Sequence, residues 1–95
     1  MAYKFTYFTD PGHGWLAVTW QQARNAGILD KITGCSYISD TGQTIYLEED
    51  CDMNMFLKIL TEQGTKFELR CVNTDKDSSI RDKRRYKPCL VCTRL

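Results

Sequence analysis

His13 is the chain's only histidine, and it lies in the stretch FTDPGHGWLAV, residues 8–18, three positions after Asp10. A neighbouring carboxylate can fix the tautomer of an imidazole, as acid–base or metal chemistry requires. The same residues also suit a tight turn, because Asp at the first position of a turn accepts backbone N–H bonds. We favour the turn and keep a metal-dependent enzyme around Asp10 and His13 as an alternative.

The turn interpretation gives each neighbouring residue a backbone role. Pro11 fixes φ at the first central position, and Gly12 permits a positive φ at the next. Gly14 lets the chain turn back before Trp15 enters a second strand. A hairpin is therefore expected around residues 10–14, with Trp15 either in the core or exposed as a contact for a protein partner.

The run EEDCD, residues 48–52, places four carboxylates within five residues where a strand is expected to give way to a helix. Asp50 or Asp52 can cap that helix, and acidic side chains stabilise the positive end of its dipole. Capping and the helix dipole do not account for Glu48 and Glu49. The patch could bind a divalent cation, act as an acid–base pair or imitate phosphates toward a basic partner, although no glycine-bearing calcium loop surrounds it.

The charge changes sign along the chain. Residues 1–74 carry six Lys or Arg and nine Asp or Glu, whereas residues 75–95 carry seven and three, so the net charges are −3 and +4. Basic residues flank an aromatic ring in IRDKRRYKP, which contains Arg81, Arg84, Arg85 and Tyr86. Cations beside an aromatic ring suit phosphate contact with base stacking. A solvated tail, or an arm that packs on the acidic run of the same or another copy, explains the pattern equally well.

The cysteine pattern argues against a metal or redox centre. Five cysteines, an odd number, favour reduced thiols over a disulfide framework. Cys89 and Cys92 form the one CxxC pair, but a zinc site needs further well-placed ligands and a redox pair normally opens a helix. We therefore predict no metal site and no cofactor.

These residues must be positioned by strands and helices, and the pattern of those elements predicts an α+β domain over residues 1–74. A basic arm or tail is expected over 75–95. The expected order is ββαββαβ, a mainly antiparallel sheet with two helices packed on one face. The expected strands are 3–9, 15–20, 35–39, 44–49 and 66–71. The expected helices are 20–26, capped by Thr19, and a second one that ends at Gly64 and buries Met53, Phe56, Leu57 and Leu60. In the last strand, Phe67, Leu69 and Cys71 are expected to face inward.

Composition sets the broad class. A content of 42% hydrophobic and 26% charged residues indicates a chain that folds. No apolar run approaches the roughly 18 residues that a membrane span needs, and the first residues, MAYKFTYFTD, lack the pattern of a secretory signal. We expect a soluble cytoplasmic protein with no membrane partner.

Three motifs in fixed order resemble those of a family of short uncharacterised phage, prophage and plasmid proteins: DPGHGW at 10–15, YLEEDCD at 46–52 and Ser-x-Ile-Arg within DSSIR at 77–81. The resemblance covers most of residues 3–86 and excludes the terminal CLVCTRL. It implies a mobile-element setting, in which small proteins often act by binding host or defence proteins; this is an analogy of setting and not of fold.

The expected function is therefore that of an accessory protein, not an enzyme, that binds a host or phage protein, with a homodimer as a further option. The first alternative is a nucleic-acid-binding protein that uses the basic arm. The second is the metal-dependent enzyme described above. The candidate binding residues are Asp10, His13, Trp15, Glu48, Glu49, Asp50, Arg81, Arg84, Arg85 and Tyr86.

Overall fold

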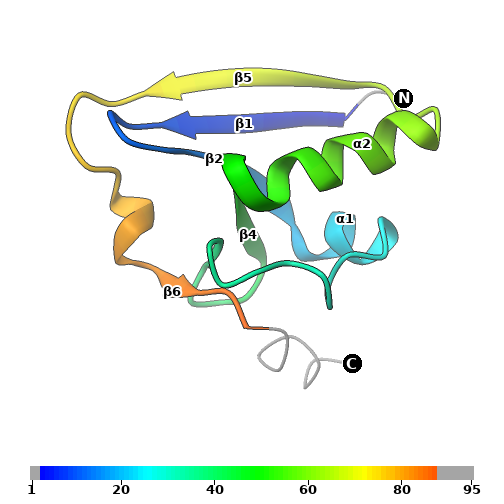
Figure 1. Cartoon of the computed structure of the whole chain (residues 1–95), viewed down its shortest axis with the longest axis horizontal. Helices are drawn as coiled ribbons and strands as arrows, with labels where there is room; N and C mark the ends of the chain where they lie inside the picture. Colours follow the sequence, from blue (N-terminus) through cyan, green and yellow to red (C-terminus); the bar gives the residue numbers. More distant parts are fainter. Residues whose placement is uncertain (1–2, 88–95) are drawn as a thin grey trace.

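Six strands and two α-helices are formed by residues 3–87, the part of the chain that the computed structural model describes (Figure 1). The strands are β1 Tyr3–Thr9, β2 Gly14–Thr19, β3 Tyr37–Ile38, β4 Thr44–Glu48, β5 Phe67–Asn73 and β6 Arg84–Arg85. The helices are α1 Trp20–Asn25 and α2 Asn54–Glu62, with a π-helical segment, η1 Glu49–Met53, before α2 and a 3-10 helix, η2 Ser79–Asp82. The order through β5 is ββαββαβ, which confirms the predicted α+β fold.

The strands form one sheet in the order β5-β1-β2-β4-β3-β6. Neighbouring strands are antiparallel except β1 and β5, which run parallel over seven residue pairs. Figure 1 shows β1 and β5 side by side at one edge of the sheet, with β6 at the far edge. The sheet is therefore mainly antiparallel, as predicted.

Local interactions explain why α1 begins and ends where it does. The Thr19 side chain accepts a hydrogen bond of 3.0 Å from the Gln22 backbone N–H, and the Gln22 side chain accepts one of 2.9 Å from the Thr19 N–H. This reciprocal capping box fixes the first turn, and Gly27, with φ of 73°, follows the last. Across residues 3–87, no helix is both long enough and apolar enough to cross a membrane.

The main hydrophobic core lies between the helices and one face of the sheet. Side chains alternate between the two faces along a strand, and every second residue of β1, β2 and β4 packs against the helices. Phe56 and Leu60 of α2 are almost fully buried among them, as the i, i+4 spacing predicted. The buried sheet residues of this cluster are Phe5, Leu16, Val18, Ile38, Ile45 and Leu47.

The opposite face of the sheet carries a second, smaller cluster. Trp15 of β2, Tyr37 of β3 and Ile80 of η2 are buried in it, and Phe8 and Tyr46 pack against them. The sheet residues of this cluster alternate along their strands with the residues of the main core, so they face away from α1 and α2. We call this surface the aromatic face.

Residues 79–86 belong to the same folded unit, which corrects the picture of a separate arm that begins at residue 75. β6 pairs with β3, and η2 places Ile80 on the aromatic face. Tyr86 is buried in the main core, where its backbone N–H donates to the Ser36 carbonyl at 2.8 Å and its hydroxyl donates to the Leu29 carbonyl. Cys89 and Cys92 lie outside the described residues.

β5 does not bury the face that its alternating sequence predicts. Phe67 packs against the core, but Leu69 is 39% exposed and Cys71 is also exposed. The strand lies at the edge of the sheet with β1 as its one neighbour, so little packs over its outer part. Leu69 and Cys71 are therefore exposed and not buried, contrary to the prediction.

Candidate functional site

Asp10 connects the DPGHGW turn to the SSIR segment of η2. Its side chain has no exposed surface, and its two oxygens accept hydrogen bonds from three backbone N–H groups, of Gly12, His13 and Ser78, at 2.9–3.0 Å. The Arg81 guanidinium donates to both oxygens, from Nε at 2.7 Å and from Nη2 at 3.0 Å. Hydrogen bonding to Arg81 holds the pKa of Asp10 well below its usual range, and Asp10 raises the pKa of Arg81.

The glycines of the turn do not act through backbone conformation as predicted. Gly12 does not adopt a positive φ among the described residues, so the prediction of a left-handed turn position is wrong. The corner is closed instead by the Asp10 side chain and by a 2.9 Å backbone bond from the Asp10 N–H to the His13 carbonyl. Gly14 is required for space, because a Cβ atom there would lie 2.7 Å from Cζ of Tyr7.

Trp15 forms the floor of the aromatic face beside Arg81. The guanidinium carbon of Arg81 lies 5.2 Å from the centre of the indole ring, and the Tyr37 ring meets the indole edge-on at 6.2 Å. Trp15 is only 1% exposed, so it is not an exposed contact for a partner. Its indole N–H is buried and has no hydrogen-bond acceptor among the residues that the structure describes.

His13 and Glu48 join the DPGHGW and YLEEDCD motifs. His13 Nδ1 lies 3.2 Å from Glu48 Oε1, with 45% of the histidine side chain and 7% of the glutamate side chain exposed. The other oxygen of Glu48 accepts backbone hydrogen bonds from Asp50 at 2.8 Å and Cys51 at 3.1 Å, and so caps η1. The predicted cap by Asp50 or Asp52 is therefore wrong. α2 itself continues from η1 without a side-chain cap.

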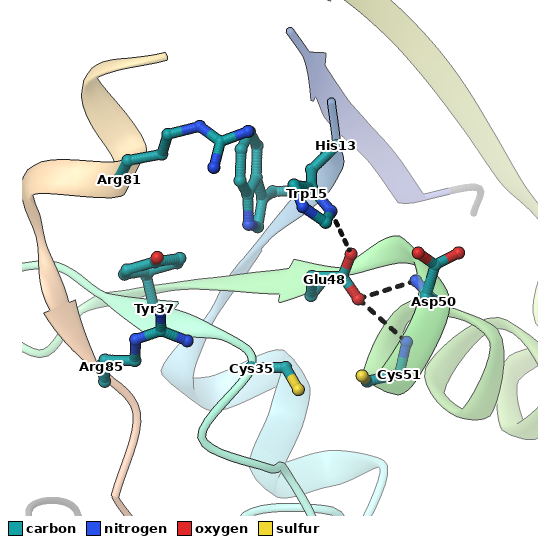
Figure 2. Close-up of a pocket in the computed structure, with 9 residues that line it drawn as sticks. All are labelled: His13, Trp15, Cys35, Tyr37, Glu48, Asp50, Cys51, Arg81 and Arg85. Carbon is teal, nitrogen blue, oxygen red and sulfur yellow. Dashed lines mark hydrogen bonds and ion pairs between the residues drawn. The ribbon is translucent and has the colours of Figure 1, made fainter. Parts of the chain in front are cut away.

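These contacts surround a pocket of about 240 Å³ between β2, β4, η1 and the C-terminal segment (Figure 2). On one side lie His13 and the carboxylates of Glu48 and Asp50, and on the other lie the guanidinium groups of Arg81 and Arg85. The Arg85 group is 5.0 Å from the centre of the Tyr37 ring. The pocket therefore has a negative and a positive wall. Its lining is completed by Trp15, Tyr37, Cys35 and Cys51.

Cys35 and Cys51 lie together at one end of the pocket and are both free thiols. Figure 2 shows their sulfur atoms turned toward each other. The hydrogen bond to Cys35, together with burial and the nearby Glu48, raises the pKa of Cys51 to about 12. The Cys51 thiol is therefore protonated at neutral pH and is a weak nucleophile.

Six of the ten predicted binding residues line the pocket: His13, Trp15, Glu48, Asp50, Arg81 and Arg85. Asp10 lies behind it as the partner of Arg81. Glu49 accepts a hydrogen bond from the Tyr7 hydroxyl, and the pKa of Tyr7 is raised by burial and by this carboxylate. Arg84 is exposed outside the pocket. Tyr86, the ring that the nucleic-acid alternative would stack on bases, is in the core and is not an exposed binding residue.

Three pocket residues were missed by the sequence analysis: Cys35, Tyr37 and Cys51. The stretch CSYIS carried one available signal, because Tyr37 and Ile38 must face opposite sides of a strand. Nothing in the sequence placed Cys35 beside Cys51, since sixteen positions separate them.

Comparison with protein-family models, with curated proteins and with solved structures yielded no match. The resemblance to phage and plasmid proteins therefore stays a prediction.

Proposed function

We propose that this chain is a small accessory protein of a phage or other mobile element that acts by binding a host or phage protein at the pocket on its aromatic face. One observation carries the proposal. The three motifs, which lie far apart in the sequence, are joined by the Asp10–Arg81 and His13–Glu48 contacts and together build this one pocket.

The chemistry of the pocket suits recognition by charge. A segment that carries both signs can place its acidic group against Arg85 and its basic group against Glu48 and Asp50. Arg81 is held by Asp10 and by the indole of Trp15, so its position is fixed before a partner arrives. Such preorganisation lowers the entropic cost of binding.

The arrangement supports binding over catalysis by the groups first considered. Asp10 bonds the backbone N–H of His13 and not its ring, so the two residues do not form an acid–base pair. Asp10 also does not line the pocket, since its oxygens face the turn, Ser78 and Arg81. Cys51, which the sequence did not single out, has a raised pKa and is a poor nucleophile as well.

The alternative of nucleic-acid binding by the basic segment needs an exposed aromatic ring that can stack on bases. Tyr86 is buried, and the aromatic rings near the other cations are already covered, with Lys83 5.4 Å from the Tyr46 ring centre. Phosphate contacts alone bind weakly and weaken steeply with salt. A gel shift at low salt with DNA and RNA distinguishes this alternative from the proposal.

The test of the proposal is affinity capture from host lysate with matched variants. Arg85→Ala and His13→Ala each remove an exposed pocket side chain, and Lys58→Ala removes an exposed cation from α2, on the other face of the sheet. We expect a protein retained by the wild type and by Lys58→Ala to be lost from both pocket variants. Equal retention by every variant contradicts the proposed surface.

A further inference from the structure

We propose that His13, Glu48 and Asp50 bind a hydrated divalent transition-metal cation of the Zn²⁺ or Mn²⁺ class. One ligand atom from each residue, an imidazole nitrogen or a carboxylate oxygen, lies within 4.8 Å of the other two. The inference goes beyond the proposed function, because it concerns what occupies the pocket when no partner is bound. It departs from the leading prediction of no metal site and is closer to the alternative of a divalent cation bound by the acidic run.

Glu48 is preorganised as a ligand. Its Oε2 atom holds the Asp50 and Cys51 backbone N–H groups, which leaves Oε1 directed at His13. Figure 2 shows the Asp50 carboxylate on the same side of the pocket, beside that of Glu48. Asp50 and His13 are both exposed, so small rotations of their side chains suffice to close the ligand atoms around a cation.

The local charge favours a divalent ion. Glu48 and Asp50 bring two negative charges together, and His13 carries at most one positive charge, only when it is protonated. The guanidinium groups across the pocket have other partners, since Arg81 bonds Asp10 and Arg85 donates to the Gly34 carbonyl at 3.1 Å. A divalent cation would neutralise both carboxylates.

The buried indole N–H of Trp15 is an independent sign that the pocket receives an oxygen-bearing occupant. Trp15 is 1% exposed, lines the pocket and offers a donor for which the described residues provide no acceptor. In Figure 2 the indole nitrogen lies at the lower end of the ring, on the side of Tyr37. An unpaired buried donor of this kind lowers the stability of the folded chain. A water or oxyanion carried by the cation supplies the missing acceptor.

The donor set selects the class of metal. One imidazole nitrogen and two carboxylate oxygens match Zn²⁺ and Mn²⁺ and are less suited to Ca²⁺, which prefers oxygen ligands alone. Three protein ligands leave at least one coordination position open, as in sites that hold an exchangeable water. Cys35 and Cys51 stand outside the set of converging ligand atoms.

The experiment titrates Zn²⁺ and Mn²⁺ separately into the full chain by isothermal calorimetry. NMR then identifies the residues whose signals are broadened by Mn²⁺. We expect the wild type to bind a single cation and His13→Ala and Asp50→Asn each to weaken binding by about 100-fold. Both substituted residues are exposed, so the fold should survive; circular dichroism checks this. Asp40→Asn, which removes an exposed carboxylate elsewhere, is the matched control and should bind as the wild type does.

Two results overturn the proposal. One is the absence of binding to the folded wild type by either metal. The other is Zn²⁺ binding that persists in His13→Ala and Asp50→Asn but disappears in Cys35→Ser or Cys51→Ser, because the thiols would then be the ligands. Broadening by Mn²⁺ confined to residues near 13, 48 and 50 supports the proposal.

Discussion

At the scale of single residues, the candidate side chains fall into two groups. Some line the pocket, and others fix the position of residues that line it. Asp10 carries the charge expected of a catalytic group, yet all its bonds go to the turn, to Ser78 and to Arg81. His13, which the sequence analysis treated as its partner, faces Glu48 instead. The turn therefore positions the histidine through the backbone.

The Asp10 carboxylate should make the stability of the fold depend on pH in the acidic range. Its pKa is lower in the folded chain than the value of about 3.9 expected when unfolded, so the unfolded state takes up a proton first as the pH falls. The stabilisation is complete above about pH 4 and is lost below it. We expect Asp10→Asn to lower the melting temperature by several degrees at pH 7, and the difference from wild type to shrink below pH 4. Thermal melts across pH measure this, and a constant difference contradicts it.

Gly14 should tolerate no side chain. A Cβ there would approach the Tyr7 ring, whose hydroxyl is tied to Glu49, so Gly14→Ala should cost about 1 to 3 kcal/mol of unfolding free energy by overpacking. Gly34→Ala is the control, since a Cβ at Gly34 meets nothing within 4 Å and its φ is not positive. It should change stability by less than about 0.5 kcal/mol. Urea denaturation compares the two, and equal stabilities would refute the steric argument.

At the scale of elements, the acidic run is divided by the π-helical turn of η1. Glu48 caps η1 and lines the pocket, whereas Asp52 does not line it and is 1% exposed. Asp52 accepts hydrogen bonds from the Thr33 N–H at 3.0 Å, from the Thr33 hydroxyl at 2.9 Å and from the Ser36 hydroxyl. It thereby fastens the loop before β3 to the start of α2, and β3 in turn supplies Tyr37.

Asp52 and Asp50 should therefore respond very differently to the same change. Asp52→Ala leaves three donors without their acceptor and should cost roughly 2 to 3 kcal/mol of unfolding free energy. Asp50→Ala, two positions earlier and exposed, should stay within about 0.5 kcal/mol of the wild type. Chemical denaturation of both variants measures the contrast. A comparable loss in the two would show that the run acts only through its summed charge.

At the scale of the whole molecule, the basic C-terminal segment completes the fold and the site together. β6 extends the sheet beyond β3, and Arg81, Lys83 and Arg85 place their cations over the rings of Trp15, Tyr46 and Tyr37. These residues alternate along the chain and so fall on the aromatic face, while Tyr86 enters the main core. The positive charge of this segment thus becomes one wall of the pocket.

Tyr86 distinguishes a docked segment from a solvated tail. Because its ring is buried, Tyr86→Ala should cost about 3 to 5 kcal/mol. Arg84→Ala, in the same segment but exposed, should be nearly neutral. Thermal and chemical denaturation of the two variants measure the difference in their stability. A Tyr86→Ala protein as stable as the wild type would mean that residues 79–86 contribute nothing to the folded state.

The sequence by itself determined what depends on neighbours along the chain. The alternation of β1, the Thr19–Gln22 capping box and the spacing of Phe56 and Leu60 each involve residues at most four positions apart. Such local patterns specify the elements and, through them, the α+β class. They also marked six of the residues that line the pocket, although not as one group.

Only the tertiary structure decided which of those residues meet. The Asp10–Arg81 contact spans 71 positions and the His13–Glu48 contact spans 35, and no local periodicity encodes contacts at such separations. They follow from the order of strands in the sheet, which brings the ends of β2 and β4 together and returns the C-terminal segment beside β3. The same packing buried Tyr86 and exposed Leu69, because burial depends on what covers a face and not on the alternation that defines it.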